Sequence, residues 1–139
     1  MNEVKFNTQI CTTREQSERL LAMGVNPETA DMVHYKSASM KEWGVLPCSF
    51  TEECSWYPKT YFPAWSLHRL IELLPQHIHL DDYADTHYWL VIDPLKVIYK
   101  NSYSSWIYQC DEGGLYDKLI NTIEWTINHN HFNKEYLKQ

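Results

Sequence analysis

Two histidines and an aspartate alternate along one short segment of the chain, at His77, His79 and Asp81. In an extended strand, alternate side chains point to the same side, so the two imidazoles would lie about 6.6 Å apart along the chain. Two histidines and a carboxylate can hold iron or zinc. The same alternation fits a strand whose Ile78 and Leu80 face a core while the polar residues face water, and we favour this structural interpretation over a metal site.

The cysteines Cys11, Cys48, Cys54 and Cys110 are the residues that could do thiol chemistry. Cys48 and Cys54 are too far apart in sequence for a usual zinc pair, because such pairs are spaced by about two to four residues and need two more ligands. Only the fold could bring Cys11, His34 or Cys110 to them. We therefore expect reduced, buried or idle thiols, with a metal site or a disulfide as the lesser alternatives.

Cys110 precedes the last predicted helix, whose positive dipole end could favour the thiolate and create a nucleophile. The adjacent Asp111 and Glu112 oppose this effect, because a neighbouring anion disfavours the thiolate. No general base can be identified for it. The sequence therefore predicts no catalytic residue, and an enzyme is the less favoured class.

A helix of about three turns is predicted between Pro63 and Pro75, because proline fits a first helical turn and also ends a helix. One apolar stripe runs along it, formed by Leu67, Leu70, Ile71 and Leu74.

Four side chains of this predicted helix lie away from the stripe: Trp65, His68, Arg69 and Glu72. They form the i, i+4 pairs Trp65 with Arg69 and His68 with Glu72, which can touch on a helix. Such pairs could line a pocket, or they could do no more than decorate a helix surface.

Residues 36–62 show no sustained periodicity and are predicted to form a long loop rich in aromatic residues. These residues include Trp43, Phe50, Trp56, Tyr57, Tyr61 and Phe62. Long ordered connections are often functional, and tryptophan and tyrosine dominate interface hot spots. The loop is expected either to fold over the core as a lid, which we favour, or to form a recognition surface.

The rest of the chain shows clear signals for helices and strands. A capping box at Thr12 or Thr13 predicts a first helix that ends at Gly24. Asn26 with Pro27 predicts a second short helix that carries Ala30 and Val33 and could extend to His34. Residues 77–80, 88–92, 95–99 and 103–110 predict an antiparallel meander. The spacing of Tyr116, Leu119, Ile120, Ile123 and Ile127 predicts a long C-terminal helix.

This order of elements predicts an α+β fold with N-terminal helices, a central helix, a small antiparallel β-meander and a long C-terminal helix packed on one face of the sheet. The 139 residues suit a single domain, and 44% hydrophobic content supplies its core. The net charge of -6 argues against general nucleic-acid binding. We also expect no membrane span, no signal peptide and a cytoplasmic location. No glycine-rich phosphate loop occurs, and no cofactor is predicted.

Three stretches carry a resemblance to a known family: residues 12–17 (TTREQS) with Leu20, Leu21 and Gly24, residues 29–32 (TADM), and residues 63–67 (PAWSL) with Leu70, Leu73, Leu74 and Pro75. The chain resembles an uncharacterised family of small proteins from gut anaerobic bacteria and their phages or mobile elements. The resemblance covers the first 32 residues and the proline-bounded helix, reaches the strands and last helix only through their general pattern, and leaves 36–62 unmatched. It implies a biological setting but no activity and no functional residue.

Three functions follow as hypotheses. The first is a small cytosolic binding or accessory protein that recognises a protein partner through the aromatic loop and the Trp65 face of the central helix. The weak binding residues are Trp43, Trp56, Tyr57, Tyr61, Trp65, His68, Arg69 and Glu72. The second is a metal-binding protein or metal-dependent enzyme using some of His68, His77, His79, Asp81, Cys48 and Cys54. The third is an acidic inhibitor that mimics nucleic acid, although acids scattered among lysines make a poor mimic.

Overall fold

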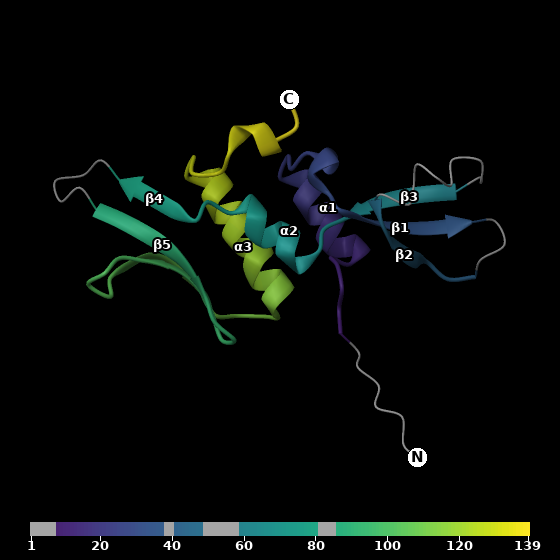
Figure 1. Cartoon of the computed structure of the whole chain (residues 1–139). Helices are drawn as coiled ribbons and strands as arrows, with labels where there is room; N and C mark the ends of the chain where they lie inside the picture. Colours follow the sequence, from purple (N-terminus) through teal and green to yellow (C-terminus); the bar gives the residue numbers. More distant parts are fainter. Residues whose placement is uncertain (1–7, 38–40, 49–58, 81–85) are drawn as a thin grey trace, which may run out of the picture.

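The computed structural model describes residues 8–37, 41–48, 59–80 and 86–139. Within these ranges, three α-helices lie between two antiparallel sheets, one of three strands and one of four (Figure 1). The predicted α+β class, with a long C-terminal helix against a sheet, is confirmed. None of the helices in the described ranges is long and apolar enough to cross a membrane.

The first helix, α1 (Arg14–Ala22), begins and ends as predicted. The Gln16 amide donates to Thr13 Oγ1 (3.1 Å) while the Thr13 amide donates to Gln16 Oε1 (3.0 Å), which completes a capping box. Gly24 then takes a φ of +96°, and the Val25 amide returns to the carbonyl of Leu20 (3.1 Å).

The second predicted helix is wrong. Pro27–Thr29 forms only a single 3-10 turn, η1, and the chain then extends into strand β1 (Met32–Ser37), which contains Val33 and His34. Asn26 does cap this turn as expected, since its side chain accepts from the amide of Glu28 (3.0 Å). The helix fails to continue because β1 obtains its backbone partners from strands on both sides, an interaction between distant segments that overrides the local cap.

The three-stranded sheet was not predicted. Its other strands are β2 (Gly44–Pro47) and β3 (Lys59–Ala64), and its order is β2-β1-β3 with antiparallel pairing. Both strands fall largely inside the segment 36–62 that was predicted to be an irregular loop, so this prediction is wrong for the described parts of the segment. Residues 49–58 lie outside the described ranges.

The central helix, α2 (Leu67–Leu73), is shorter than predicted. It begins after the N-cap Ser66, whose hydroxyl accepts from the amide of Arg69 (3.1 Å), whereas Pro63 lies in β3 opposite Val33. Proline is tolerated there because β3 is an edge strand of its sheet. The predicted stripe does bury Leu70 and Leu74, with Leu67 and Ile71 partly buried.

The four-stranded sheet is the predicted meander. Its strands are β4 (His77–Leu80), β5 (Thr86–Ile92), β6 (Val97–Lys100) and β7 (Trp106–Cys110), paired in chain order. The long helix α3 (Leu115–Asn128) lies between this sheet and α2 (Figure 1). Leu119, Ile120 and Ile123 are fully buried in the main core.

The C-terminal segment closes the core near the end of α1. After α3, a 3-10 turn, η3 (Lys134–Tyr136), brings the chain back, and Val25 forms an isolated antiparallel bridge with Leu137. The amide of Asn26 donates to the carbonyl of Tyr136 (2.8 Å), and the amide of Lys138 donates to the carbonyl of Gly24 (2.7 Å). The C-terminal segment is thus joined to the turn that follows α1.

Candidate functional site

Trp65, the residue on which the predicted binding surface depended, is not on the helix and is not exposed. It follows β3, and its side chain is 0% exposed within the main core. Its indole N–H donates to Thr29 Oγ1 (2.9 Å), and its backbone amide and carbonyl both bond to Thr12 (3.0 and 2.8 Å). Trp65 therefore lies outside the helix on which its i, i+4 pair with Arg69 was predicted, and it cannot contribute to an open recognition face.

Polar groups around Trp65 join the N-terminal segment, the three-stranded sheet and α2. The backbone amide of Ser66 donates to Asp31 Oδ1 (2.8 Å), and its hydroxyl donates to Asp31 Oδ2. The guanidinium of Arg69 donates to the carbonyl of Thr29 (3.0 Å). Because these hydrogen bonds join three elements, we interpret this Trp65 junction (Thr12, Thr29, Asp31, Trp65, Ser66 and Arg69) as structural, although the buried Nε of Arg69 has no hydrogen-bond partner among the described residues.

The other predicted residues of α2 form surface ion pairs. His68 Nε2 lies 3.1 Å from Glu72 Oε1, as the predicted i, i+4 pair requires, and Arg69 Nε lies 3.5 Å from the same oxygen. The His68 side chain is 83% exposed. Exposed pairs of this kind contribute little and define no pocket.

Of the aromatic residues of the predicted loop, Trp43, Tyr61 and Phe62 are described. The guanidinium of Arg14 lies 4.2 Å from the centroid of the Trp43 ring and 5.5 Å from that of Phe62, so a cation–π contact ties α1 to the three-stranded sheet. Tyr61 is exposed. Phe50, Trp56 and Tyr57 lie outside the described residues, and so does Cys54.

The described cysteines Cys11, Cys48 and Cys110 form no disulfide with one another. Burial, and secondarily the negative charge of Asp31, raises the pKa of Cys11 to about 11 and also raises the pKa of Cys48. A raised pKa disfavours the thiolate and so opposes nucleophilic chemistry at both residues. His34, a possible companion ligand, instead bonds the carbonyl of Thr12 through Nε2 (2.7 Å).

Three histidines meet on β4 and β5, and we call His77, His79 and His87 the histidine ladder. His77 and His79 lie on one face of β4 as predicted, with Ile78 buried on the other. The register places His87 directly opposite His79 and Trp89 opposite His77. Nε2 of His77 lies 2.6 Å from Nδ1 of His87, and the rings of His79 and His87 stack with centroids 4.3 Å apart at 7°.

His87 was missed because the predicted strand began at residue 88, whereas β5 begins at Thr86. If the predicted strand had been begun at Thr86, its alternation would have placed His87 on the same face as Trp89, and the buried Tyr88 on the other face. The pairing with His79 could not have been found in this way, because it depends on the register between two strands. Asp81, the predicted third metal ligand, lies outside the described residues.

The histidine ladder belongs to a wider surface that we call the ladder face: His77, His79, His87, Trp89, Lys100 and Trp106. Lys100 is the register partner of Trp89 and also of Trp106, the latter beyond an irregularity in the β6–β7 pairing between Tyr99 and Lys100. The three residues thus form a row across three strands. Trp89 is 46% exposed and Trp106 is 59% exposed. The four strands contain no aspartate or glutamate, and Lys100 is their only lysine or arginine.

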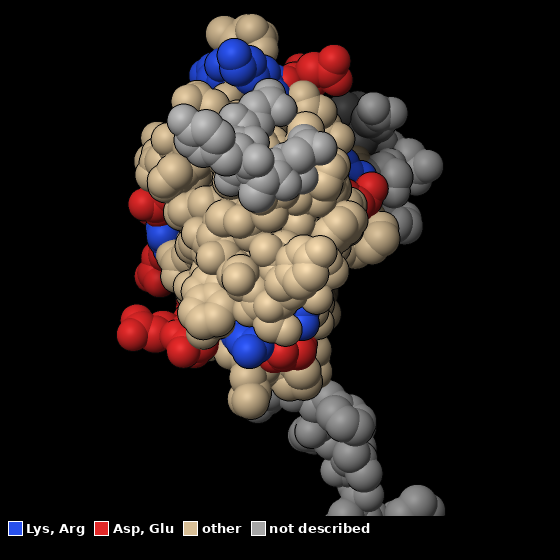
Figure 2. Space-filling view, turned by 90° about the vertical axis from the view of Figure 1, so that its left-hand side faces the viewer, with Lys and Arg blue, Asp and Glu red and all other residues tan. Residues whose placement is uncertain are grey.

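Figure 2 views the molecule from the side of this sheet. Uncharged residues occupy most of the visible surface, and charged side chains of both signs gather at its margins. An exposed region that is poor in charged side chains and carries large aromatic ones is unusual for a protein of net charge -6. The ladder face is therefore the strongest candidate site in the described part of the chain.

The ladder is not a ready metal site. Among the described residues, no group of three or more histidine, cysteine, aspartate or glutamate side chains could hold a metal ion. The facing nitrogens of His77 and His87 are directed at each other, and the His79 and His87 rings stack in parallel, so the three rings do not converge on one point.

A second aromatic cluster surrounds Trp125 near the end of α3. Its ring stacks with those of Tyr99 (5.8 Å between centroids), Tyr108 (4.8 Å) and His129 (4.7 Å), and it also contacts His131. Burial, and then the nearby His129, lowers the pKa of His131. This cluster joins α3 to the inner face of the four-stranded sheet and is part of the fold.

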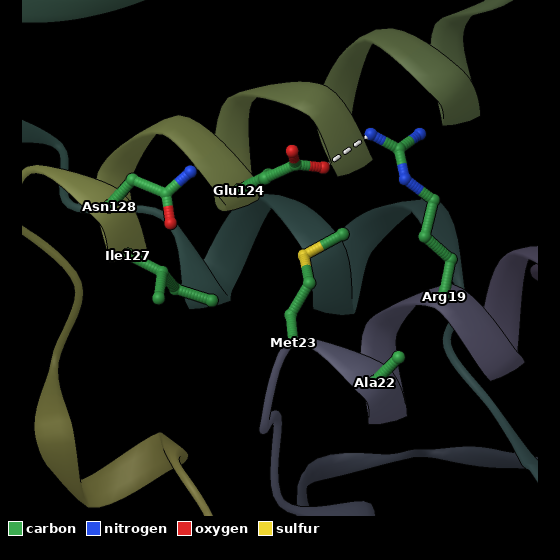
Figure 3. Close-up of a pocket in the computed structure, with 6 residues that line it drawn as sticks. All are labelled: Arg19, Ala22, Met23, Glu124, Ile127 and Asn128. Atoms are coloured by element: carbon green, nitrogen blue, oxygen red, sulfur yellow. Dashed lines mark hydrogen bonds and ion pairs between the residues drawn. The ribbon is translucent and has the colours of Figure 1, made fainter.

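A small open pocket lies between α1 and α3 (Figure 3), with a volume of about 270 Å³. It is lined by Arg19, Ala22, Met23, Glu124, Ile127 and Asn128. The guanidinium of Arg19 is already paired with Glu124 (2.6 Å) and bonded to Asn121 (2.5 Å). With its charges satisfied internally and a volume below that of most ligand sites, the pocket is a weaker candidate than the ladder face.

Comparisons with protein-family models, with curated proteins and with solved structures returned no match. The resemblance to the family from gut anaerobes accordingly stays a prediction. The assignment of function therefore depends on the geometry of the chain itself.

Proposed function

We propose that this chain is a small binding protein that recognises a protein partner through the ladder face. The observation that carries the proposal is the exposure of Trp89 and Trp106 in one row across strands that contain no carboxylate. Tryptophan provides a large contact area and is enriched among the residues that dominate binding energy. A partner that covered these two rings would remove them from water, which favours binding.

This proposal keeps the protein partner of the first hypothesis but moves the recognition surface. The helix and loop surface had been expected to centre on Trp65, which is fully buried in the Trp65 junction. The ladder face carries the same residue types, tryptophan and histidine, in an exposed and rigid strand arrangement. Strands position side chains more firmly than a loop does, which lowers the entropic cost of binding.

A capture experiment with matched variants tests the proposal. The purified chain, tagged at one end, is crosslinked in a lysate of cells that express it, and the captured proteins are compared with those of Trp89→Ser/Trp106→Ser. The matched control is Leu95→Ser/Tyr103→Ser, because these residues are 76% and 87% exposed but lie in the turns between strands.

We expect a specific set of proteins to be captured by the wild type and by the turn variant and to be absent with the ladder-face variant. Circular dichroism would verify that all three proteins are folded. If the ladder-face variant captured the same proteins as the turn variant, the proposal would be wrong.

The metal and nucleic-acid-mimic alternatives stay hypotheses, and the metal alternative has a test of its own. Elemental analysis of protein purified without a histidine tag measures bound zinc, copper or iron directly. One equivalent of metal, lost in His77→Gln, would favour the second hypothesis over a purely protein-binding role.

A further inference from the structure

We propose that the protein partner recognised by the ladder face is a second copy of this chain, an inference that rests on the proposed binding function. The inner side of the four-stranded sheet is occupied by α3, whose Trp125 stacks with Tyr99 and Tyr108. No described helix or strand packs on the outer side, and the three-stranded sheet lies at the opposite end of the molecule (Figure 1). The described fold therefore leaves the outer side to another molecule.

The register of the strands orders the outer side chains into rows. The tryptophan row takes one residue from each strand: His77, Trp89, Lys100 and Trp106. Two residues further along β5 and β6, on the same side of the sheet, lies the aliphatic row: Val91, Ile98 and Gln109. Both rows are separated from the connection between β4 and β5 by the pair of His79 and His87.

The order of residues in the tryptophan row makes this row complementary to its own reverse. Suppose that two copies meet face to face about a two-fold axis that runs along the strands, midway between β5 and β6. Each row then lies against the reversed row of the other copy, and every contact occurs twice. Lys100 of each copy faces Trp89 of the second copy, and His77 of each copy faces Trp106 of the second copy.

The contact of Lys100 with an indole of the second copy is chemically favourable. An ammonium group over the face of a tryptophan ring is attracted by the electrons of that ring. Both Lys100 and Trp89 are exposed, and among the described residues Lys100 takes part in no ion pair. The tryptophan row thus supplies both members of this contact, the cation and the ring.

The direction of the axis follows from the charge of Lys100. A two-fold axis laid across the strands, along the tryptophan row, would place Lys100 against Lys100 of the second copy, and like charges repel. The axis along the strands avoids this repulsion. It also places Val91 opposite Ile98 of the second copy. Ile98 is already only 4% exposed, so the tryptophan row supplies most of the new contact.

Self-complementarity is the reason for assigning the face to a second copy. A surface that binds an unrelated protein has no need to match itself, whereas an isologous interface must do so. The resulting arrangement is an ordinary one for antiparallel sheets, which stack face to face about 10 Å apart with their strands within about 30° of each other. Helix α3 of each copy would lie on the outside of this pair of sheets.

The size of the face sets the strength expected of the dimer. Four strands about 4.8 Å apart, each contributing about five residues of roughly 3.3 Å, form a face of about 19 by 17 Å. Covering this face in both copies removes on the order of 1,000 Å² of surface from water, near the lower limit for a specific interface. We therefore expect a reversible dimer with a micromolar dissociation constant.

Sedimentation velocity of the untagged chain measures this association, at concentrations from about 1 to 200 μM around the expected dissociation constant. The wild type and the turn variant Leu95→Ser/Tyr103→Ser should change from monomer to dimer over this range. Trp89→Ser/Trp106→Ser should raise the dissociation constant about 100-fold or more and stay monomeric. A wild type that stays monomeric throughout, or a ladder-face variant that dimerises as the wild type does, would overturn the proposal.

Charge variants test the contact between Lys100 and the indole, and they alter only exposed side chains. Lys100→Arg keeps the cation and should dimerise as the wild type does, whereas Lys100→Glu should raise the dissociation constant about tenfold. Lys134→Glu, on the exposed turn η3, changes the net charge by the same amount and should leave dimerisation unchanged. Equal weakening by the two glutamate variants would assign the effect to net charge and contradict the proposal.

The two proposals can fail separately. A chain that stays monomeric, yet needs Trp89 and Trp106 to capture other proteins, would remove the second-copy inference and leave the binding function intact. Self-association that needs the tryptophan row, combined with capture of other proteins that the tryptophan substitutions do not affect, would do the reverse.

Discussion

The Trp65 junction and the ladder face contain similar residues and put them to opposite uses. At the junction, Trp65 is 0% exposed and its polar groups bond to Thr12 and Thr29. On the ladder face, Trp89 and Trp106 are half exposed, and His77 bonds to His87. Residue type alone therefore does not separate structural from functional aromatic residues. The two regions differ in whether other residues of the fold already provide hydrogen-bond and packing partners for the aromatic side chains.

The largest expected effect comes from the junction. Trp65→Ala should lower the free energy of unfolding by about 3–5 kcal/mol, because it leaves a cavity in the main core and also removes the donor to Thr29 Oγ1. Trp65→Phe keeps most of the ring and should cost clearly less. Urea denaturation followed by circular dichroism measures both values. A loss below about 1 kcal/mol for Trp65→Ala would remove the distinction drawn between the two regions.

The elements predicted correctly are those whose signals are local. The capping box of α1, the turn at Gly24, the alternation of β4 and the periodicity of α3 all depend on residues within one or two turns of each other. The three-stranded sheet was missed because β1 obtains its partners from segments distant in the chain, and the proline that was predicted to start the central helix sits instead on an edge strand.

The candidate site depends even more on pairing between distant segments, which the sequence pattern does not reveal. Two of its histidines could be placed on one side of a strand from the sequence, since alternation is a local property. That His87 lies opposite His79, and that Trp89 and Trp106 join one row through Lys100, depends on register across four strands. Register is set by the packing of buried faces, which the alternation pattern alone does not specify.

The next effect in size is a dependence of stability on pH, which we expect at the Trp65 junction. Cys11 is buried beside the junction, where burial raises its pKa to about 11 from an ordinary value near 9. Between these values the unfolded chain loses the thiol proton while the folded chain keeps it. The contribution of Cys11 to stability is therefore complete below about pH 9 and is lost as the pH rises toward 11.

Thermal denaturation at pH 8, 9 and 10 measures this effect. The melting temperature of the wild type should fall over this range more steeply than that of Cys11→Ala, which lacks the titrating group. Tyr99 and Tyr108, whose pKa values burial also raises, are present in both proteins and cancel in the comparison. If the melting temperatures of the two proteins fell in parallel with rising pH, Cys11 would not contribute to the pH dependence of stability.

The smallest expected effect on stability is on the ladder face itself. Trp89→Ala/Trp106→Ala should change the free energy of unfolding by no more than about 0.5 kcal/mol per residue, because the two rings stand on the outer side of the sheet and leave no core cavity. A loss approaching that of Trp65→Ala would mean that the face is held together by its own aromatic residues and would weaken the case for a partner. A change in the free energy of unfolding near zero would support the comparison. Two large aromatic side chains that expose apolar surface and contribute little to folding are best explained by a contact with another molecule.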